Sequence, residues 1–388
     1  MRFPEFSGEW EETTLGKISE VTKGSGISKD QLSEQGSPCI LYGELYTKYK
    51  SEIIGEVYSR TELDSSSLVK SKANDVIIPC SGETAIDIST ARCVPFNNIL
   101  LGGDLNIIRL KNDDGGFFAY QLNGVRKTDI ARVAQGVSVV HLYGENLKQI
   151  TVYHPAIEEQ KKITRLLSLI DERIATQNKI IEKMESLIKG LSQRLLSPKQ
   201  GWTSYKLDEL CQIKSGYSGI QVSFQTAYKV SRIETISNHC INMSRIGFVK
   251  EIPQEYKLSV GDILFSNINS VQYIGNTAFI DKDYGLYHGM NLLRIVPDSR
   301  IVFPRFIHLL LCSERLLRHF QSICNKAVSQ ASINQTSLGK TIITIPSYKE
   351  QQHICSIIES VERKLDIETS LLKMLQYQKQ YLLRQMFI

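Results

Sequence analysis

Two long segments of the chain carry apolar side chains at alternating spacings of four and three residues. The first extends from about residue 156 to 197, and its repeating positions hold Ile163, Leu167, Ile170, Ile174, Ile181, Met184, Ile188, Leu191 and Leu195. The second extends from about residue 347 to 387, with Ile354, Ile358, Val361, Leu365, Leu372, Leu375, Leu382 and Met386. A repeat of this period predicts two coiled-coil helices. At about 1.5 Å of rise per residue, each helix is expected to be roughly 60 Å long.

Polar residues interrupt the apolar rows at Gln177 in the first helix and at Glu368 and Lys379 in the second. Neither helix can bury its row alone, and a tandem arrangement requires the two to pack antiparallel. Gln177 and Glu368 occupy equivalent positions near the helix midpoints, where the helices would meet. Because an unpaired buried carboxylate is costly, Glu368 is predicted to bond Gln177 and fix the register, with a solvated kink as the alternative. Lys379 is expected to extend its amino group to water and to need no partner.

Each helix closes a unit that occurs twice in the chain. The motif P-x-x-x-E-Q-x-x-I, at the start of each helix, occupies residues 155–163 and 346–354. The motif W-x-x-x-x-L-x-x-[IL], at the start of each unit, occupies residues 10–18 and 202–210. The two offsets, 191 and 192 positions, are nearly the same. A tandem pair of units is a means of presenting two similar surfaces at a fixed separation.

Between these motifs, short apolar runs bounded by turn residues predict strands. They occupy residues 75–79, 106–110 and 150–153 in the first unit and residues 262–266, 291–295 and 341–345 in the second. Helical stretches are expected at residues 116–123 and 304–313. The order of elements is shared, whereas the connecting loops differ. The predicted fold class is α+β, with two tandem mixed α/β domains at 1–154 and 199–345, separated by two long helices, at 155–198 and 346–388, that form an antiparallel coiled coil.

The composition is that of a globular protein of the cytoplasm. The chain of 388 residues is too long for one core, and its hydrophobic content of 42% is ordinary. It has no apolar run of about 18 residues and no signal sequence, so neither a membrane span nor secretion is expected. Its eight cysteines include no C-x-x-C pair, which favours a reducing compartment over disulfides or a zinc site. The net charge of +5 permits nucleic-acid binding without requiring it.

No catalytic motif is found. The chain has no G-x-G-x-x-G, no phosphate-binding G-x-x-x-x-G-K-[ST] loop and no [DNS]-P-P-[FYW] tetrapeptide of the kind that an amino-group DNA methyltransferase would carry. Its seven histidines form no H-x-x-x-H pair. We therefore predict no catalytic residue and no metal site in this chain.

In the absence of a catalytic motif, the side chains of the loops indicate a binding function. The loops that differ between the units are rich in basic and hydrogen-bonding side chains, which can contact DNA bases or phosphates. The candidate DNA-contacting residues of the first unit are Lys23, Lys48, Lys50, Ser81, Thr84, Gln135 and Ser138. Those of the second unit are Lys214, Tyr217, Asn267, Asn269, Lys326, Ser329 and Gln330. Each loop taken alone is typical of a solvated loop, but their equivalent places in a duplicated frame favour base readout.

With its doubled P-x-x-x-E-Q-x-x-I element, the heptad helix after each copy and the doubled opening motif, the chain resembles the specificity (S) subunit of Type I restriction-modification systems over its whole length. The resemblance implies that each α/β domain is a target recognition domain and that the helices are spacers. It implies a non-catalytic subunit that binds an asymmetric, bipartite site in double-stranded DNA, one half per domain. The implied spacer and subunit-interface residues are Glu159, Gln160, Ile163, Gln177, Glu350, Gln351, Ile354 and Glu368.

The resemblance also implies partners. Two modification subunits would carry S-adenosylmethionine and methylate an adenine in each half-site, which requires the base to leave the stack. Restriction subunits, where present, would carry ATP, Mg²⁺ and the cleavage activity. This chain is then expected to hold no cofactor of its own and to have no membrane partner.

Three other interpretations stay open at this point. A protein-binding scaffold or adaptor would explain the duplication and the coiled coil equally well, but its binding would not show the salt-sensitive DNA affinity that phosphate contacts require. A complete methyltransferase-nuclease is disfavoured because its motifs are missing. A modification system without restriction subunits is compatible with the same sequence.

Overall fold

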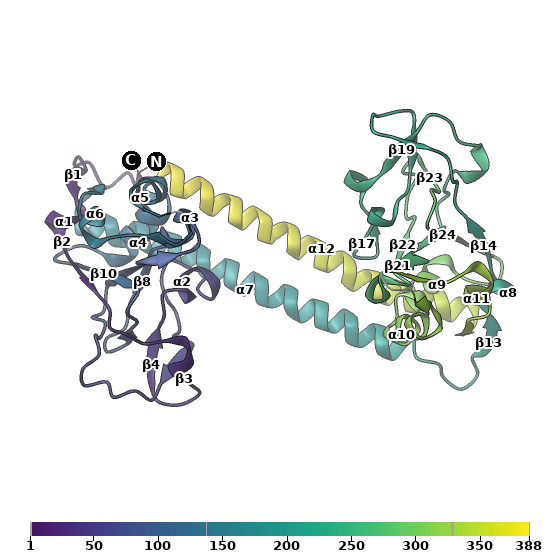
Figure 1. Cartoon of the computed structure of the whole chain (residues 1–388), viewed down its shortest axis with the longest axis horizontal. Helices are drawn as coiled ribbons and strands as arrows, with labels where there is room; N and C mark the ends of the chain where they lie inside the picture. Colours follow the sequence, from purple (N-terminus) through teal and green to yellow (C-terminus); the bar gives the residue numbers. More distant parts are fainter. Residues whose placement is uncertain (1, 137, 327–329, 388) are drawn as a thin grey trace. The chain divides into compact units, whose positions relative to one another are not determined.

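The computed structural model describes residues 2–136, 138–326 and 330–387. The chain divides into two compact units: residues 1–180 with 368–388, and residues 181–367. Two long helices, α7 (Ile157–Leu195) and α12 (Tyr348–Gln385), are each divided between the two units. Both helices predicted from the heptad pattern are therefore confirmed (Figure 1). No helix in the described ranges is long and apolar enough to cross a membrane.

The first unit is built on a four-stranded antiparallel sheet in the order β2-β10-β6-β8. Its strands are β2 (Ser19–Lys23), β10 (Leu105–Leu110), β6 (Asp75–Pro79) and β8 (Arg92–Val94). The central strands β6 and β10 are buried because both faces of the sheet are covered. Val76 and Ile78 pack toward α4 (Gly115–Asn123) and α7, and Ile77 packs on the other face toward Ile40 and Leu45.

The other face carries a second sheet, β3-β5-β4-β9, with strands β3 (Leu32–Ser33), β5 (Ser59–Thr61), β4 (Ser37–Ile40) and β9 (Leu100–Leu101). The unit also contains the strand pair β1 (Glu11–Thr14) and β12 (Thr151–His154), and the pair β7 (Ser81–Gly82) and β11 (Val140–His141). Its short helices are α1 (Leu15–Ile18), η1 (Lys29–Gln31), α2 (Glu44–Thr47), α3 (Ala85–Ile88), α5 (Lys127–Val133) and α6 (Gly144–Lys148).

The second unit repeats this plan. Its four-stranded antiparallel sheet has the order β14-β24-β20-β22, with β14 (Cys211–Ser215), β24 (Leu293–Pro297), β20 (Ile263–Phe265) and β22 (Thr277–Phe279). The side chains of β20 alternate as those of β6 do. Ile263 and Phe265 face α9 (Pro304–Leu311), α10 (Glu314–Ile323) and α12, whereas Leu264 faces the opposite cluster with Leu258.

A second sheet, β15-β19-β16-β23, is formed by β15 (Gln221–Val222), β19 (Gly247–Val249), β16 (Tyr228–Val230) and β23 (Leu286–Tyr287). The remaining strands are β13 (Thr203–Lys206) with β27 (Ile342–Ile345), β17 (Ile236–Ser237) with β18 (Cys240–Ile241), and β21 (Ile268–Asn269), β26 (Ala331–Ser332) and β25 (Asn325–Lys326). The remaining helices are α8 (Leu207–Leu210), α11 (Gln335–Gly339), η2 (Ile233–Thr235), η3 (Met243–Arg245), η4 (Gln254–Tyr256) and η5 (Val271–Tyr273). The predicted α+β class and the shared order of strands are confirmed.

The duplicated opening motif forms part of each core. Trp10 packs on Phe117 of α4 with ring centroids 5.5 Å apart, and Trp202 packs on Phe306 of α9 at 6.1 Å. The C-terminal Phe387 lies 5.2 Å from Phe117 and completes the first core. The motif therefore recurs because the same aromatic contact holds the strand-to-helix frame in both units.

A buried ion pair is also duplicated. Asp75 at the start of β6 accepts two hydrogen bonds from Arg109 on β10, at 2.9 and 2.7 Å. Asp262, just before β20, pairs with Arg294 on β24 at 2.7 Å. Burial raises the pKa of Asp262, and Arg294 offsets this effect. Each pair links the two central strands of its sheet.

Candidate nucleic-acid interface

In the first unit, two loops beside the central sheet meet in a short ladder. Ser81 on β7 lies opposite His141 on β11. Gln135 bridges His141 from the other side: its backbone N–H donates to the carbonyl of His141 at 2.9 Å, and the N–H of His141 donates back at 2.7 Å. Ser81, His141 and Gln135 therefore lie across three adjacent segments, and we call them the first loop row.

The second unit forms the same arrangement. Asn269 on β21 lies opposite Ala331 on β26, and Ala331 lies opposite Lys326 on β25. Lys326 stands 191 positions after Gln135, the offset of the repeated helix motif. Asn269, Ala331 and Lys326 form the second loop row. The two rows share a strand-pairing plan but do not match residue by residue: Ala331 is buried at 1% exposure, Val140, 191 positions before it, is buried as well, and Ser332 is the position that matches His141.

Exposed apolar side chains border both rows. Helix α3, which carries the exposed Ile86, packs on β7 and β11. The ring of Tyr143 is 47% exposed and stacks on His141 with centroids 6.2 Å apart. In the second unit, Tyr273 is 50% exposed and follows β21 by four positions. Such side chains can contact thymine methyl groups beside hydrogen-bonding residues. Sequence reasoning missed them, although aromatic residues next to the selected loops could have indicated them.

Each row is fixed to its unit by an asparagine amide. Nδ2 of Asn106 donates to the carbonyl of Leu142 at 2.9 Å, directly after β11. Nδ2 of Asn267 donates to the carbonyl of Ile333 at 3.3 Å, directly after β26. A supported loop loses less conformational freedom when it binds a ligand, which favours affinity.

A glutamine joins each long helix to its own domain. Oε1 of Gln160 accepts the backbone N–H of Asp114, the residue that caps α4, at 2.9 Å, and Nε2 donates to the carbonyl of Pro155 at 2.9 Å. Gln351 repeats this contact: Oε1 accepts the N–H of Phe303 at 2.8 Å, and Nε2 donates to Pro346 at 3.0 Å. Both glutamines are 1% exposed. The repeated glutamine therefore ties the start of each long helix to its own domain.

Glu159, the residue before Gln160, also makes a contact within the first unit. Both carboxylate oxygens of Glu159 accept hydrogen bonds from Arg2, at 2.7 and 2.6 Å. This bidentate pair ties the N-terminal segment to the start of α7. Paired donors of this kind are the strongest class of ionic hydrogen bond in proteins.

The predicted contact between the helix midpoints is confirmed. Nε2 of Gln177 on α7 donates to Oε2 of Glu368 on α12 at 2.6 Å, and it also lies 3.0 Å from the backbone oxygen of Glu368. Both residues belong to the first unit, where the N-terminal part of α7 meets the C-terminal part of α12. That this pair fixes the register stays a prediction.

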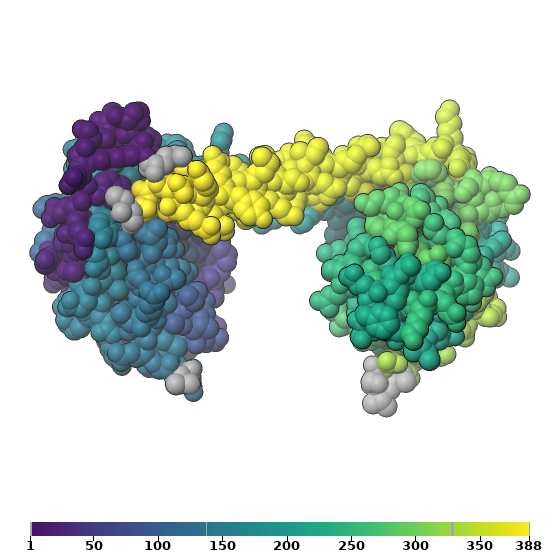
Figure 2. Space-filling model, turned by 90° about the horizontal axis from the view of Figure 1, so that it is seen from above, coloured from purple at the N-terminus to yellow at the C-terminus, as the bar shows by residue number. Residues whose placement is uncertain are grey.

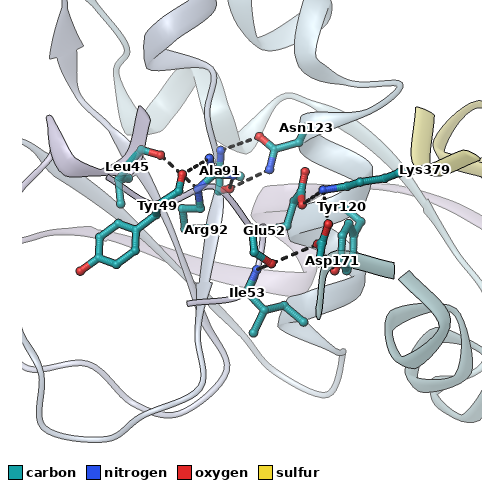
Figure 3. A network of polar contacts seen from close by, with 11 residues as sticks. Leu45, Tyr49, Glu52, Ile53, Ala91, Arg92, Tyr120, Asn123, Asp171 and Lys379 are labelled. Carbon is teal, nitrogen blue, oxygen red and sulfur yellow. Dashed lines mark hydrogen bonds and ion pairs between the residues drawn. The ribbon is translucent and has the colours of Figure 1, made fainter. Parts of the chain in front are cut away.

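The expectation for Lys379 is wrong. Its Nζ is 2.5 Å from Oε2 of Glu52 and 2.6 Å from Oδ1 of Asp171, and the side chain is only 13% exposed (Figure 3). Asp171 also accepts the hydroxyl of Tyr120 at 2.8 Å and that of Ser51 at 3.0 Å. Burial raises the pKa of Glu52, and Lys379 opposes that rise. Two buried carboxylates need a cation, and Lys379 supplies it instead of extending to water.

A family model described as the Type I restriction modification DNA specificity domain matches residues 7–186 and again residues 199–377. The chain belongs to this family. It contains two tandem copies of this specificity domain, and each matched range includes most of one long helix, α7 or α12.

Related proteins agree with this assignment. The MjaVIII Type I restriction enzyme specificity subunit of Methanocaldococcus jannaschii is 22% identical over 95% of this chain and 89% of its own length. The MjaX specificity subunit of the same organism is 33% identical, but the match spans 48% of this chain and 46% of that protein. A Type I restriction-modification S subunit from M. genitalium has the same fold, with a TM-score of 0.64, 17% identity and coverage of 100% and 99% of the two chains.

The specificity-domain fold brings some of the candidate residues together and separates others. Ser81, Gln135, Asn269 and Lys326 lie in the loop rows. Ser138 and Gln330 are exposed in the same loops, whereas Ser329 lies outside the described residues. The remaining candidates lie elsewhere or are engaged within the protein: Lys23, Lys48, Lys50, Thr84, Lys214, Tyr217 and Asn267.

Three of these candidates have a structural role. Nζ of Lys48 is 2.6 Å from Oε1 of Glu44, a carboxylate that is 5% exposed. The hydroxyl of Thr84 caps α3 by accepting the N–H of Asp87 at 3.1 Å. Asn267 supports the second row as described above, so these three side chains are engaged in holding their domains.

The other four candidates are not members of the rows, although Lys23 pairs with Asn106, which supports the first row. Lys23 and Lys214 stand on the edge strands β2 and β14, and Tyr217 packs on Tyr256 with centroids 5.3 Å apart. Lys50 is exposed, and its Nζ donates to the carbonyl of Thr47 at 3.0 Å. A DNA contact by any of them stays a prediction.

The motif residues of the spacer helices make contacts within this chain. Ile163 and Ile354 are 2% and 3% exposed and lie in the hydrophobic cores of the two units. Together with the buried Glu159, Gln160 and Gln351, they offer no surface to another subunit. Glu350 is half-buried at the start of α12. A DNA or subunit contact by these buried motif residues is therefore not possible without unpacking the cores.

Proposed function

We propose that this chain is the DNA-reading, non-catalytic subunit of a Type I restriction-modification complex and that it recognises an asymmetric site in two halves. Residues 1–154 and 199–345 would each read one half, and residues 155–198 and 346–388 would be the spacers that set the gap between them. The observation that carries the proposal is the pair of loop rows. A similar strand pairing places Ser81, His141 and Gln135 together in one unit, and Asn269 and Lys326 on either side of the buried Ala331 in the other.

The chemistry of the rows supports different half-sites. An amide such as that of Gln135 can bond adenine through two atoms, and a lysine such as Lys326 can donate to guanine. A two-fold symmetric dimer with identical surfaces would instead read a palindrome. Two units with different rows therefore favour an asymmetric target.

The partners proposed for this subunit are two modification subunits, which carry S-adenosylmethionine, and restriction subunits where the system includes them, which carry ATP and Mg²⁺. All would act on DNA in the cytoplasm. A stripe of exposed apolar residues on the C-terminal part of α12 offers a docking face for a partner helix: Leu371, Met374, Tyr377 and Tyr381. The surface of this part of the helix, in yellow, is partly open to solvent in Figure 2. Large exposed apolar patches commonly mark such interfaces.

The proposal is tested by changing one row at a time in the complex with the modification subunit and mapping methylated adenines in a host that lacks adenine methylation. Ser81→Ala combined with Gln135→Ala should relax one half of the methylated motif and leave the other half unchanged. Asn269→Ala combined with Lys326→Ala should have the converse effect. Gln35→Ala combined with Ser67→Ala, two exposed positions outside the row, is the control. If either row variant relaxed the sequence requirement in both halves of the motif, the proposal that each unit reads one half would be contradicted.

A further inference from the structure

The first unit contains a small polar cavity that none of the contacts above explains. Its volume is about 300 Å³, and its lining residues are Tyr46, Lys50, Glu52, Asp87, Thr90, Arg92, Asn123 and Lys127. Three of these side chains are cations, and two are carboxylates. The carboxylates are already engaged: Glu52 pairs with Lys379, and Asp87 accepts the hydroxyl of Thr84 at 2.6 Å.

Arg92 is held rigidly at this cavity. The side chain is 7% exposed, and its guanidinium donates to the backbone carbonyls of Leu45, Tyr49 and Ala91 at 3.1, 2.8 and 3.3 Å (Figure 3). Carbonyls orient a guanidinium but carry no full negative charge. The position of Arg92 is therefore fixed by these carbonyls, and Glu52 and Asp171 act on its charge without a hydrogen bond to it.

Lys127, at the start of α5, faces the same cavity. Burial and the nearby charge of Arg92 both lower the pKa of Lys127, while Asp87 opposes them. Two cations that repel each other in a partly buried cavity are stabilised when an anion binds between them. The exposed Lys50 adds a third positive charge at the rim.

The cavity lies next to the first loop row. A side chain on Gly82 of β7 would come within 3.8 Å of the hydroxyl of Tyr46, which lines the cavity. Helix α3, which carries Asp87, packs on both strands of the row and on α5. In the second unit, the strand that matches β8 carries Thr277, Ala278 and Phe279, with no arginine. The cavity chemistry is thus specific to the first unit.

We propose that the cavity of Lys50, Arg92 and Lys127 binds a phosphate of the DNA backbone beside the half-site that the first loop row reads. The proposal rests on the proposed function and adds to it a contact that positions the domain without reading sequence. Phosphate contacts fix register and orientation, whereas base contacts specify sequence. Arginine and lysine are the usual donors to phosphate oxygens.

The test measures binding of the full chain, in complex with its modification subunit, to a duplex that carries its methylated motif, at several salt concentrations. Lys127→Gln should weaken binding to this duplex and to an unrelated duplex by a similar factor, roughly tenfold, and should reduce the slope of log affinity against log salt by about 0.9. Asp87→Asn keeps the hydrogen bond to Thr84 but removes a negative charge, so it should tighten binding roughly threefold. Lys29→Gln, an exposed lysine outside the cavity, is the control.

Replacing single backbone phosphates of the duplex by neutral methylphosphonates locates the contact. A methylphosphonate at one position beside the first half-site should lower the affinity of the unmodified complex for the duplex. The same methylphosphonate should not lower the affinity of the Lys127→Gln complex any further. Additive losses at every position would overturn the proposal, as would an unchanged salt slope. If inorganic phosphate instead stabilised the unmodified complex but not the Lys127→Gln complex, with no change in the slope of log DNA affinity against log salt, that result would assign the cavity to free phosphate and overturn the DNA contact. If the unmodified complex itself shows no motif-specific, salt-dependent binding, the proposed function fails rather than the cavity assignment alone.

Discussion

Replacing Lys379 by alanine should destabilise the first unit selectively. The substitution leaves Glu52 and Asp171, which are 7% and 8% exposed, without their shared cation. Removing one partner of a buried ion pair typically costs about 3–5 kcal/mol. Arg92 lies close enough to Glu52 to offset part of this cost, so we expect about 3 kcal/mol at pH 8. In a unit of this size, the loss corresponds to a fall of about 6–12 °C in Tm.

The two tryptophans of the chain allow the units to be followed separately. Trp10 packs in the first core and Trp202 in the second. Urea unfolding of a Trp202→Phe background therefore reports on the first unit, and a Trp10→Phe background reports on the second. Lys379→Ala should shift the Trp10 transition and leave the Trp202 transition in place. Lys373→Ala, an exposed position on the same helix, should change either transition by less than about 0.5 kcal/mol.

The loss should also depend on pH. The pKa of Glu52 is raised by burial, so protonating Glu52 costs the folded state less than the unfolded state, and stability contributed by this group grows as pH falls. Without Lys379 that pKa rises further. The deficit of Lys379→Ala should therefore shrink as pH falls from 8 toward 5, and Glu52→Gln in the same chain should restore part of the loss at pH 8. A deficit below about 1 kcal/mol, or one that is the same at both pH values, would refute this reasoning.

Three further predictions concern the spacer helices. Gln160→Ala should lower the stability of the first unit, and Gln351→Ala that of the second, by about 2–3 kcal/mol each, because a buried N–H and a carbonyl lose their partners; the two tryptophan transitions measure this. Glu368→Leu should loosen the register opposite Gln177, and crosslinking mass spectrometry of the two helices should then detect more than one pairing. Deleting seven residues from both helices should shorten the gap of the methylated motif by about three base pairs, because a heptad spans about 10 Å and a base pair about 3.4 Å; an unchanged gap would show that the helices do not set it.

Local periodicity explains why the sequence predicted part of this molecule well. Residues at heptad spacing share one face only in a helix, so the apolar rows predicted both long helices. The matching places of Gln177 and Glu368 in the two rows predicted their contact. The duplicated frame likewise placed the differing loops at equivalent positions, and Gln135 and Lys326 lie in two such loops. The second sheet of each unit was not predicted, because its strands of two to four residues carry too little pattern.

The contacts that the sequence analysis missed lie at two different ranges along the chain. Lys379 meets Glu52 across 327 positions, and no local pattern indicates a partner at that distance. Lys48 and Thr84, in contrast, are engaged by residues four and three positions away, Glu44 and Asp87. Both local pairs are recognisable in the sequence, as an i,i+4 ion pair and a helix cap, and could have indicated a structural role for Lys48 and Thr84.

We propose above that two different domains of one chain read the two halves of one DNA site. Long-read mapping of methylated adenines tests this proposal in a host that lacks adenine methylation and expresses the chain with its modification subunit. We expect methylation at one asymmetric split motif, and exchange of residues 1–154 for those of a related specificity subunit should change one half only. A continuous or palindromic motif, a change in both halves on exchange, or no methylation by a stable complex would contradict it.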